Sequence, residues 1–439
     1  MFSSLDESRI RRVHLKITAL SSGGNFLDGY DLAIISVAIL LIAPEFSLSS
    51  LDQTLLLGST LLGMVFGGVI GGYLTDRDGR KSIYMWDMVF FIVFTILTAV
   101  AATFTELLVF RLLLGLAIGA DYAISPTIIA EYAPTKQRGK LLTVNGVAWF
   151  VGAAFSYLAG YFLSPLGDLG WRLMLLLGII PALLVLILRA SIPESPRWLL
   201  EKGMGEEARK SLKTVVGETG IEEIPAAARV TLRDLFRGKF LTATLFICSF
   251  WFILDAVTYA IALEGPTILQ SVFNLSYGQA SGTAALIAIL AIIGAILTFF
   301  AIDIAGRRFV TMVGFLGMVI TLFIASLFLN LSFGLIPVVI LLVLFEISQE
   351  FGPGITSTVY PQELFPTSIR ATAQGLGTTV SRIGALAGIF SFSFIVGTAG
   401  FGGGMLYLAV LSSIGLAVTI AYVVEPKGKS LEEISGEGS

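Results

Sequence analysis

Two residue types on which many enzymes depend are nearly absent from this sequence. Cys248 is the only cysteine and His14 the only histidine among 439 residues. A lone cysteine cannot form an intramolecular disulfide, so cysteine usage does not reveal the compartment. A lone histidine near the N-terminus argues against a His-based metal site or catalytic triad. The sequence also has no nucleophile–base constellation and no phosphate-binding loop, and we therefore expect no enzyme, no metal and no cofactor.

Charged residues are also scarce, at 13% of the chain against 55% hydrophobic residues. Soluble domains contain about 25% charged residues. A helix needs about 20 predominantly apolar residues to cross a bilayer. Such runs occur twelve times, at residues 15–43, 51–74, 82–104, 106–130, 140–163, 171–190, 240–264, 281–304, 309–330, 334–358, 371–397 and 403–424. The sequence thus predicts an all-α membrane protein of twelve transmembrane helices. We expect the lipid bilayer as its partner and no nucleic acid.

The placement of basic residues predicts the orientation in the membrane. Of the 28 Lys and Arg residues, all but Arg111, Arg172 and Arg382 fall near the N-terminus, in alternate connections or near the C-terminus. The other connections, at 44–50, 104–106, 164–170, 265–280, 331–333 and 398–402, contain none. Cytoplasmic loops are those that carry an excess of Lys and Arg. We therefore predict a multi-pass protein of the plasma membrane with both termini in the cytoplasm.

Two motifs recur at about half the chain length. The turn with Asp76, Gly79, Arg80 and Lys81 returns at Asp303, Gly306, Arg307 and Arg308, and EYAPTKQR at 131–138 returns as ELFPTSIR at 363–370. Such repeats are typical of transporters in which the substrate binds between two halves near mid-membrane. The prediction is two six-helix bundles, 1–190 and 240–425, joined by a cytoplasmic linker with short helices at 191–239 and followed by an exposed tail at 426–439.

Several charged residues lie within the apolar runs of the first half. Charges at this depth are costly, so each is a candidate functional residue. In the stretch 111–139 these are Arg111, Asp121 and Glu131. Asp28 and Asp31 lie three residues apart and therefore share one helix face. A buried carboxylate without a paired base tends to bind a proton. We expect one of the two to pair with Arg111 and the other to titrate.

The second half carries its own set of polar residues inside apolar runs. Trp251, Asp255 and Tyr259 are spaced by four and share a face, which favours binding of a small polar molecule; the alternative is a packing face with one neutralised Asp. Glu264 precedes Gly265-Pro266, which is expected to end the helix. Glu346 and Glu350 precede Gly352-Pro353-Gly354, where a break would free backbone groups to line a cavity. Arg382 could hold an anionic group or pair with Glu350.

These motifs resemble the major facilitator superfamily over nearly the whole chain. Its loop motif matches Gly72, Leu74, Asp76, Arg77, Gly79, Arg80 and Lys81, and its fourth-helix motif matches Arg111, Gly115 and Gly119. PESPRWL at 193–199, PKGKSLEE at 426–433 and GYD at 29–31 look like the sugar-porter-like branch. That resemblance implies that Asp31 and Arg111 form a proton-coupling pair.

Three further segments are similar to proton-coupled phosphate symporters. They are GADYAISPTIIAE at 119–131, WFILDAVTY at 251–259 and FGPGIT at 351–356. The likeness implies that Tyr122, Trp251, Asp255 and Tyr259 face the substrate. The sequence departs from that pattern because Glu264 and Glu350 stand where Asn is expected and Trp149 where Gln is expected. It also lacks the Gln-Gln pair of sugar porters, while DGYD and SRIGA (381–385) look like organic-acid symporters.

We therefore expect a monomeric, proton-coupled symporter of a sugar, organic acid or phosphate that works by alternating access. The expected proton-coupling residues are Asp28, Asp31, Arg111, Asp121 and Asp255. The expected substrate-binding residues are Tyr122, Trp149, Trp251, Asp255, Tyr259, Glu264, Glu346, Glu350 and Arg382. The expected cytoplasmic latch, which would hold the inward side shut, comprises Asp76, Gly79, Arg80, Lys81, Glu131, Arg138, Asp303, Gly306, Arg307, Glu363 and Arg370.

The balance of charge leaves other substrates open. The candidate acids within the apolar runs number seven, against two mid-span cations, Arg111 and Arg382; the seven are Asp28, Asp31, Asp121, Asp255, Glu264, Glu346 and Glu350. If all seven were ionised, the cavity would repel an anion, so either several are protonated or the substrate is neutral or cationic. The alternatives are an organic-cation or sugar uniporter or exporter without proton coupling, and a non-transporting membrane sensor. A sensor would need a signalling domain or a long tail.

Overall fold

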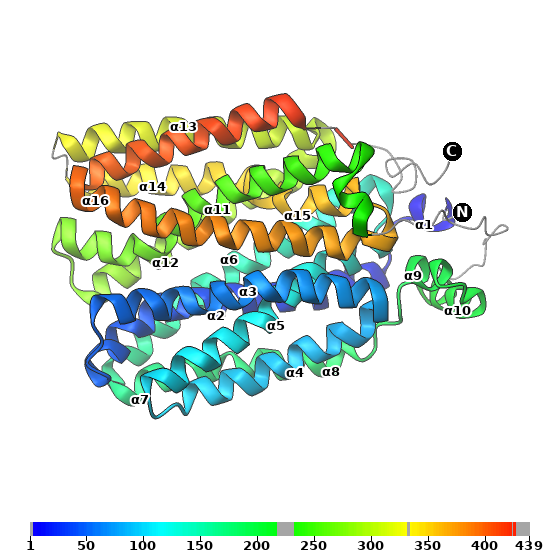
Figure 1. Cartoon of the computed structure of the whole chain (residues 1–439), viewed down its shortest axis with the longest axis horizontal. Helices are drawn as coiled ribbons and strands as arrows, with labels where there is room; N and C mark the ends of the chain where they lie inside the picture. The colour runs from blue at the N-terminus through cyan, green and yellow to red at the C-terminus, as the bar shows by residue number, and fades with distance from the viewer. Residues whose placement is uncertain (1–2, 217–231, 332–333, 424, 427–439) are drawn as a thin grey trace.

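The computed structural model describes residues 3–216, 232–331, 334–423 and 425–426 and is built from helices (Figure 1). Within these ranges no residue belongs to a β-strand. The α-helices are α1 (Ser3–Asp6), α2 (Arg12–Glu45), α3 (Ser50–Asp78), α4 (Arg80–Ala99), α5 (Phe104–Tyr132), α6 (Arg138–Leu163), α7 (Asp168–Leu177), α8 (Ile179–Arg189), α9 (Pro196–Glu201), α10 (Gly205–Val216), α11 (Gly238–Phe273), α12 (Tyr277–Ala305), α13 (Arg307–Asn330), α14 (Leu335–Glu350), α15 (Pro353–Leu364) and α16 (Arg370–Tyr422). Short 3₁₀ helices occupy Thr135–Gln137, Ser164–Leu166, Leu232–Phe236 and Thr367–Ile369.

The twelve predicted spans are present in this arrangement. Eleven helical stretches in the described ranges are long and apolar enough to cross a membrane. α7 and α8 together form one of them, and so do α14 and α15. The last stretch, α16, contains two spans because Gly400 has a non-helical backbone (φ 69°, ψ 177°) at which the chain reverses. Figure 1 shows the two parts of α16, orange and red, running side by side.

Of the two predicted helix breaks, one is present in the structure and the other is not. The tenth span is broken between α14 and α15, where Gly352 leaves the helical conformation (φ −178°, ψ −84°). The seventh span is not broken at Gly265-Pro266, because α11 continues to Phe273. Within a membrane-spanning helix, neighbouring groups can satisfy the single carbonyl that a proline leaves without a donor. The expectation that this dipeptide ends the helix was therefore wrong.

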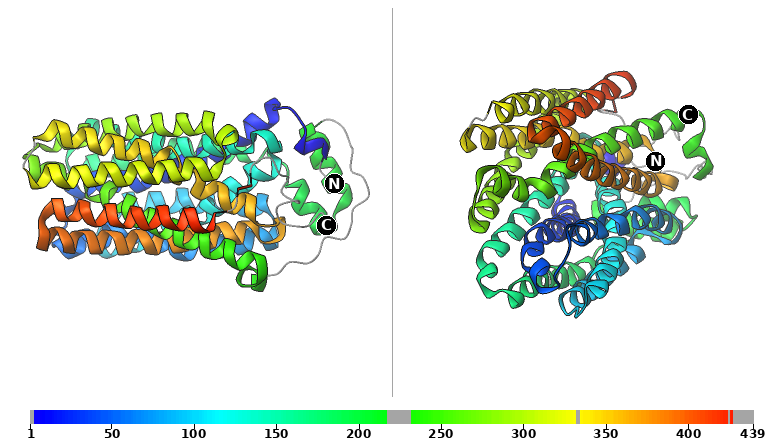
Figure 2. Two further views of the ribbon diagram at one scale, coloured as in Figure 1. Left: turned by 90° about the horizontal axis from the view of Figure 1, so that it is seen from above. Right: turned by 60° about the vertical axis from the view of Figure 1, so that its left-hand side comes forward.

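The spans form two groups that lie side by side (Figures 1 and 2). Helices α2–α8 make one group and α11–α16 the other, and the groups meet where α3 packs against α16 and α6 against α12. Helices α1, α9 and α10 lie together at one end of the bundle, which we call the linker end. The domain limits remain a prediction, although α11 begins at Gly238, inside the range predicted as linker.

Small residues allow close contacts both within and between the groups. A Cβ atom at Gly115 would collide with the carbonyl oxygen of Thr60, and one at Gly119 would lie 2.8 Å from the Gly68 amide nitrogen. These contacts confirm that the stripe containing Gly115 and Gly119 packs closely against a neighbouring helix, which is α3. On the other face of α3, Gly68 contacts Gly375 of α16 in the same way.

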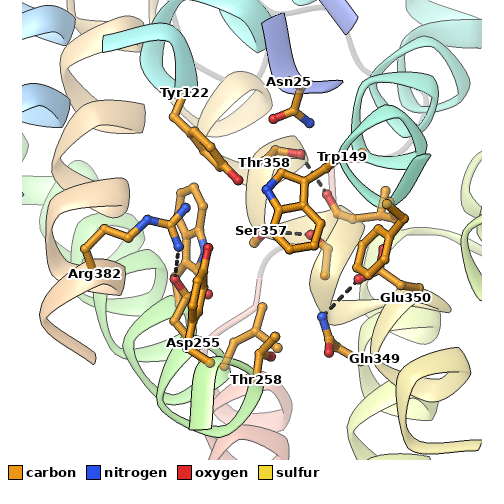
Figure 3. Close-up of a pocket in the computed structure, with 17 residues that line it drawn as sticks. Asn25, Tyr122, Trp149, Asp255, Thr258, Gln349, Glu350, Ser357, Thr358 and Arg382 are labelled. Atoms are coloured by element: carbon orange, nitrogen blue, oxygen red, sulfur yellow. Dashed lines mark hydrogen bonds and ion pairs between the residues drawn. The ribbon is translucent and has the colours of Figure 1, made fainter. Parts of the chain in front are cut away.

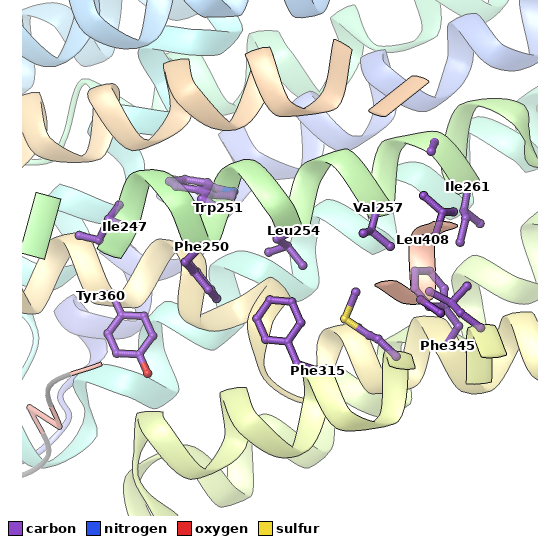
Figure 4. Packing of buried hydrophobic residues seen from close by; sticks show 14 of the residues in the cluster. Ile247, Phe250, Trp251, Leu254, Val257, Ile261, Phe315, Phe345, Tyr360 and Leu408 are labelled. Carbon is purple, nitrogen blue, oxygen red and sulfur yellow. The ribbon is translucent and has the colours of Figure 1, made fainter. Parts of the chain in front are cut away.

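An apolar cluster packs the helices of the second group against one another (Figure 4). The rings of Phe250 on α11 and Phe315 on α13 pack edge to face with centroids 5.8 Å apart. Phe246 contacts Tyr360 of α15 in the same manner, at 5.1 Å. Edge-to-face aromatic contacts contribute more than the area that they bury. They fix the orientation of α11, and this helix carries Trp251, Asp255 and Tyr259 toward the other group.

Candidate functional site

A cavity of about 560 Å³ lies between the two groups of helices (Figure 3). The residues that line it are Asn25, Tyr122, Gly146, Trp149, Phe150, Trp251, Leu254, Asp255, Thr258, Tyr259, Gln349, Glu350, Gly354, Ile355, Ser357, Thr358 and Arg382. Of the nine predicted substrate-binding residues, seven are therefore brought together here. Glu346 lines an adjoining pocket, and the side chain of Glu264 lies outside the described part of the chain.

An ion pair dominates one wall of this cavity. Arg382 Nη1 of α16 donates to Asp255 Oδ2 of α11 over 2.6 Å, and both side chains are buried. The guanidinium carbon lies 4.7 Å from the ring centroid of Tyr122 and 4.9 Å from that of Tyr259. Aromatic faces attract a cation at such distances. Of the two alternatives that the sequence left open for Arg382, pairing with Glu350 is not found, because Glu350 lies across the cavity (Figure 3).

Other polar atoms around the cavity have few partners within the protein. Glu350 Oε1 accepts a hydrogen bond from Gln349 Nε2 at 3.0 Å. The indole N–H of Trp149 and the hydroxyl of Thr258 are buried and make no hydrogen bond to a described residue. Buried polar groups normally have partners. Unpaired groups that face one cavity therefore point to a ligand with complementary donors and acceptors.

The first predicted coupling pair forms beside the cavity and not in its lining. Arg111 Nη2 on α5 lies 3.1 Å from Asp31 Oδ2 on α2, and the arginine is fully buried. This is the contact that the resemblance implies. Asp28 makes no ion pair with a described residue, and its Oδ2 atom is buried without a hydrogen bond. One acid of the two is thus paired and the other is not, as the sequence analysis expected.

A second buried cluster in the same group of helices was not predicted. Arg189, at the end of α8, lies 3.0 Å from Asp87 Oδ1 and 2.6 Å from Asp121 Oδ1. Its guanidinium also stacks on Tyr84, 3.6 Å from the ring centroid. In the sequence Arg189 falls among the basic loop flanks, and Asp87 is not among the candidate residues. Asp121 is therefore paired with a cation. Because the cluster adds one acid (Asp87) and one cation (Arg189) to the predicted set, the excess of acids over cations is unchanged.

The first latch motif forms a network that joins the two groups at the linker end. Arg80 Nη2 lies 2.7 Å from Glu131 Oε1 and 3.3 Å from Asp76 Oδ1. Glu131 also contacts Arg370 Nη1 of the second group at 3.3 Å. Asp76 Oδ2 accepts hydrogen bonds from the backbone N–H and hydroxyl of Thr372, at 2.8 and 2.7 Å. All of these side chains are buried, so the network lies inside the contact between the two groups.

The second latch motif repeats the arrangement with one difference. Arg307 lies 2.9 Å from Asp303 and 2.8 Å from Glu363. Asp303 accepts a hydrogen bond from the backbone N–H of Lys140 in the first group at 3.2 Å. By the repeat, Arg138 is the counterpart of Arg370 and would pair with Glu363. Arg138 instead lies 3.4 Å from Asp6 Oδ1 of α1.

The two predicted glycines of the latch each precede a helix whose first N–H groups bind a glutamate. Gly79 and Gly306 adopt positive φ values, 107° and 94°, which glycine tolerates best. Glu194 accepts from the N–H groups of Arg80 and Lys81, so Lys81 joins the network through its backbone. Glu425 accepts in the same way from Arg307 and Arg308. Burial raises the pKa of Glu194, while the N–H groups that donate to it act in the opposite direction.

Asp6 is a residue whose role can be tested directly. Its Oδ1 atom lies 2.9 Å from Arg197 Nη2, 2.9 Å from Thr135 Oγ1 and 3.4 Å from Arg138 Nη2. Asp6→Asn would leave two buried guanidinium groups without this carboxylate. We expect a loss of about 1–3 kcal/mol of stability, seen as a lower melting temperature of the detergent-solubilised protein. Glu7→Gln, at the exposed neighbouring position, is the control, and equal melting temperatures of the two variants would contradict the role.

Comparison with known proteins agrees with this architecture. The sequence profile of a family described as "Sugar (and other) transporter" matches residues 16–437. YaaU of Escherichia coli, which is named for metabolite transport, is 33% identical over 436 residues that cover 98% of this chain and 97% of that protein. The arabinose-proton symporter of Bacillus subtilis is 29% identical, with 95% and 93% covered.

A solved structure shows the same fold. The proton:xylose symporter XylE, bound to 6-bromo-6-deoxy-D-glucose, superposes with a TM-score of 0.85 at 24% identity and covers 96% of this chain and 98% of that chain. At this identity the likeness concerns the fold. The family profile spans nearly the whole sequence, and the repeated latch motifs and the paired six-helix arrangement fit it. The chain therefore belongs to the sugar (and other) transporter family and has the fold of the major facilitator superfamily, which consists of transporters and not enzymes.

Proposed function

We propose that this protein is a proton-coupled symporter that carries a small polar metabolite through the central cavity by alternating access. The observation that carries the proposal is the cavity itself. It lies between the two groups of helices and contains a buried ion pair and unpaired polar atoms, and the first latch network joins the two groups at the linker end. We place the linker end in the cytoplasm, on the basis of its Lys and Arg residues, and the protein in the plasma membrane as a monomer.

The latch supplies the two states that alternating access needs. In this structure Glu131 and Asp76 of the first group contact Arg370 and Thr372 of the second. Opening the linker end would require these contacts to break while Arg80 keeps Glu131 and Asp76 within the first group. Each carboxylate thus retains a cation in both states, and the cost of exposing a buried charge is avoided.

Helix α5 connects the proposed proton site with the cavity and the latch. It carries Arg111, then Tyr122, then Glu131, in that order along its length. Protonation of Asp31 would remove the charge that holds Arg111, and a shift of α5 would move the phenol of Tyr122 at the cavity and the carboxylate of Glu131 at the latch. A rigid element with two arrangements is the physical basis that such coupling requires.

The class of metabolite follows from the polar groups on the cavity walls. Arg382 is already neutralised by Asp255, so the cavity offers no uncompensated cation to an anion. The hydroxyl, amide and indole groups of the cavity walls can form hydrogen bonds with the hydroxyl groups of a sugar or with the oxygen atoms of an organic acid or a phosphate. A second candidate is an organic cation moved without proton coupling. It is favoured by Glu346 and Glu350, which face these spaces and have no basic partner in the described part of the chain.

The proposal is tested by measuring internal pH in proteoliposomes that hold an inward proton gradient. Phosphate, hexoses, pentoses, small carboxylates and organic cations would be added one at a time. We expect one of these compounds to acidify the interior. Uptake of a labelled compound without acidification would contradict symport and support the second candidate.

Asp31→Asn tests the proton-coupling role within the same assay. The amide cannot gain or lose a proton and leaves Arg111 without its counter-ion. We expect substrate-driven acidification to fall by at least about tenfold, which corresponds to 1.4 kcal/mol of lost coupling, while exchange of labelled substrate across the membrane is retained. If transport by Asp31→Asn depended on pH as the wild type does, Asp31 would not carry the proton.

A further inference from the structure

A second pocket of about 700 Å³ adjoins the central cavity and shares Trp149, Phe150 and Thr258 with it. The rest of its lining is Ala153, Tyr157, Ile261, Ala262, Gly265, Leu269, Ala284, Ile287, Ala288, Leu342 and Glu346. Along α6 and α11 these residues follow those of the central cavity, and along α14 Glu346 precedes Glu350. All three directions lead away from the linker end, so the pocket lies on the outer side of the cavity.

Glu346 is the feature of this pocket to which the proposed symport assigns no separate role. Glu346 is 7% exposed, and it makes no hydrogen bond or ion pair with a described residue. Among the described residues, no Lys or Arg belongs to the lining. A carboxylate in apolar surroundings is costly unless a cation or a proton accompanies it. The pocket therefore combines one negative group with walls that are otherwise nearly free of polar atoms.

The composition of the walls decides which cation would fit. Na⁺, Mg²⁺ and Ca²⁺ require several oxygen ligands, and besides Glu346 the described side chains offer the hydroxyl groups of Thr258 and Tyr157. An alkylated ammonium group needs no such shell, because its alkyl groups can contact Leu342, Ile287 and the aromatic rings of Trp149 and Tyr157. Aromatic faces also attract ammonium ions directly.

We propose that this pocket binds an organic ammonium ion, with Glu346 as its counter-ion and Trp149 and Tyr157 as aromatic walls. The inference deepens the proposed function and rests on it in one respect, namely that the pocket forms the outer part of the substrate path. The inference gives the substrate an ammonium group that carries alkyl groups. The indole of Trp149 lines both the ammonium pocket and the central cavity, and in the central cavity the rest of the substrate would meet the Asp255–Arg382 wall.

The test uses two probes of the same shape and different charge. Choline carries a trimethylammonium group, and 3,3-dimethylbutan-1-ol replaces its nitrogen with carbon. Binding to the full-length protein in detergent would be followed by tryptophan fluorescence and by calorimetry. We expect saturable binding of choline that is at least about tenfold tighter than that of the alcohol. Equal binding of both probes, or binding of neither, would overturn the proposal, and this comparison needs no variant that could fail to fold.

Two matched variants locate the site. Glu346→Gln keeps the shape of the side chain and should weaken choline binding by about tenfold or more without changing binding of the alcohol. Glu350→Gln, one turn along α14, should have a smaller effect. A greater loss with Glu350→Gln would place the cation in the central cavity and overturn the assignment. No proton gradient enters these measurements. If the protein binds choline but does not acidify liposomes, this site is supported and the proposed symport is contradicted. If it acidifies liposomes but does not bind choline, the symport is supported and this site is contradicted.

Discussion

Replacing Arg382 with glutamine should abolish transport and lower the stability of the protein together. The substitution leaves the Asp255 carboxylate buried without the guanidinium that lies 2.6 Å away. Removing one partner of a buried ion pair costs about 3–5 kcal/mol, and Tyr122 and Tyr259 lose the cation between them. We expect uptake into proteoliposomes to fall by at least about 100-fold, which corresponds to 2.7 kcal/mol, with a lower melting temperature.

The stability and transport effects can be separated by a double-mutant cycle. Asp255→Asn alone leaves Arg382 unpaired, whereas the double variant removes both charges and should recover most of the melting temperature. If the pair serves transport, the double variant will be stable and still inactive. A stable double variant that transports at the wild-type rate would show that the two charges only neutralise each other. This is the packing alternative that the sequence analysis kept open for the face of Asp255.

Much of the fold could be predicted because its signals are local in the sequence. Each span is an apolar run, and its ends are marked by charged or helix-breaking residues. The connection at 398–402 was expected, and the reversal occurs at Gly400. The latch was predictable because its members sit in two motifs that occur twice. The pairing of Asp31 with Arg111 came from a family resemblance, since no local pattern specifies which acid reaches an arginine 80 positions away.

The contacts that could not be predicted depend on how deeply a side chain is buried and on partners that lie far away in the sequence. Arg189 ends an apolar run, and the rule for basic flanks does not distinguish an exposed flank from a buried side chain. It is fully buried because Asp87 and Asp121 of α4 and α5 neutralise it. Asp87 did carry a usable signal, because it is a charge within an apolar run. The partner of Arg382 depended on which helix packs against α16, and that helix is α11.

The N-terminal segment shows how a symmetric expectation can fail. The two halves repeat the latch motifs, but the segments that precede α2 and α11 differ: α1 precedes α2, whereas the 3₁₀ helix Leu232–Phe236 precedes α11. The N-terminal segment contributes Leu5, which is fully buried, and Asp6, which takes Arg138 as its partner. The latch is therefore unequal, with Glu131 bound to Arg370 across the two groups while Arg138 is held within the first group and its linker. Repeat symmetry predicts which residues are present, and the N-terminal segment with Asp6 decides which contact Arg138 makes.

Gly375→Leu should prevent the linker end from closing and thereby stop transport. Gly375 of α16 faces Gly68 of α3, where even a Cβ atom would collide with the Gly68 carbonyl oxygen. Backbone cannot yield as a flexible side chain can, so relief requires α3 and α16 to separate. Separation at this level would break the hydrogen bonds between Asp76 and Thr372 nearby. The cost of overpacking, about 1–3 kcal/mol, would therefore fall on the closed state, while an open linker end would remain accessible.

The measurement is labelling of a cavity cysteine from the linker side. Thr358→Cys, in a chain with Cys248→Ser, places the thiol among the residues that line the cavity. A membrane-impermeant maleimide applied to inside-out vesicles should label it rapidly when Gly375→Leu is present and slowly when it is not. Gly397→Leu is the matched control, because Gly397 lies on the same helix and a Cβ atom added there would meet no described atom within 4 Å. Labelling that stays slow in Gly375→Leu, or transport that continues at the wild-type rate, would mean that contact between α3 and α16 is not required for closure. Rapid labelling together with lost transport would identify this contact as the surface on which the two halves close.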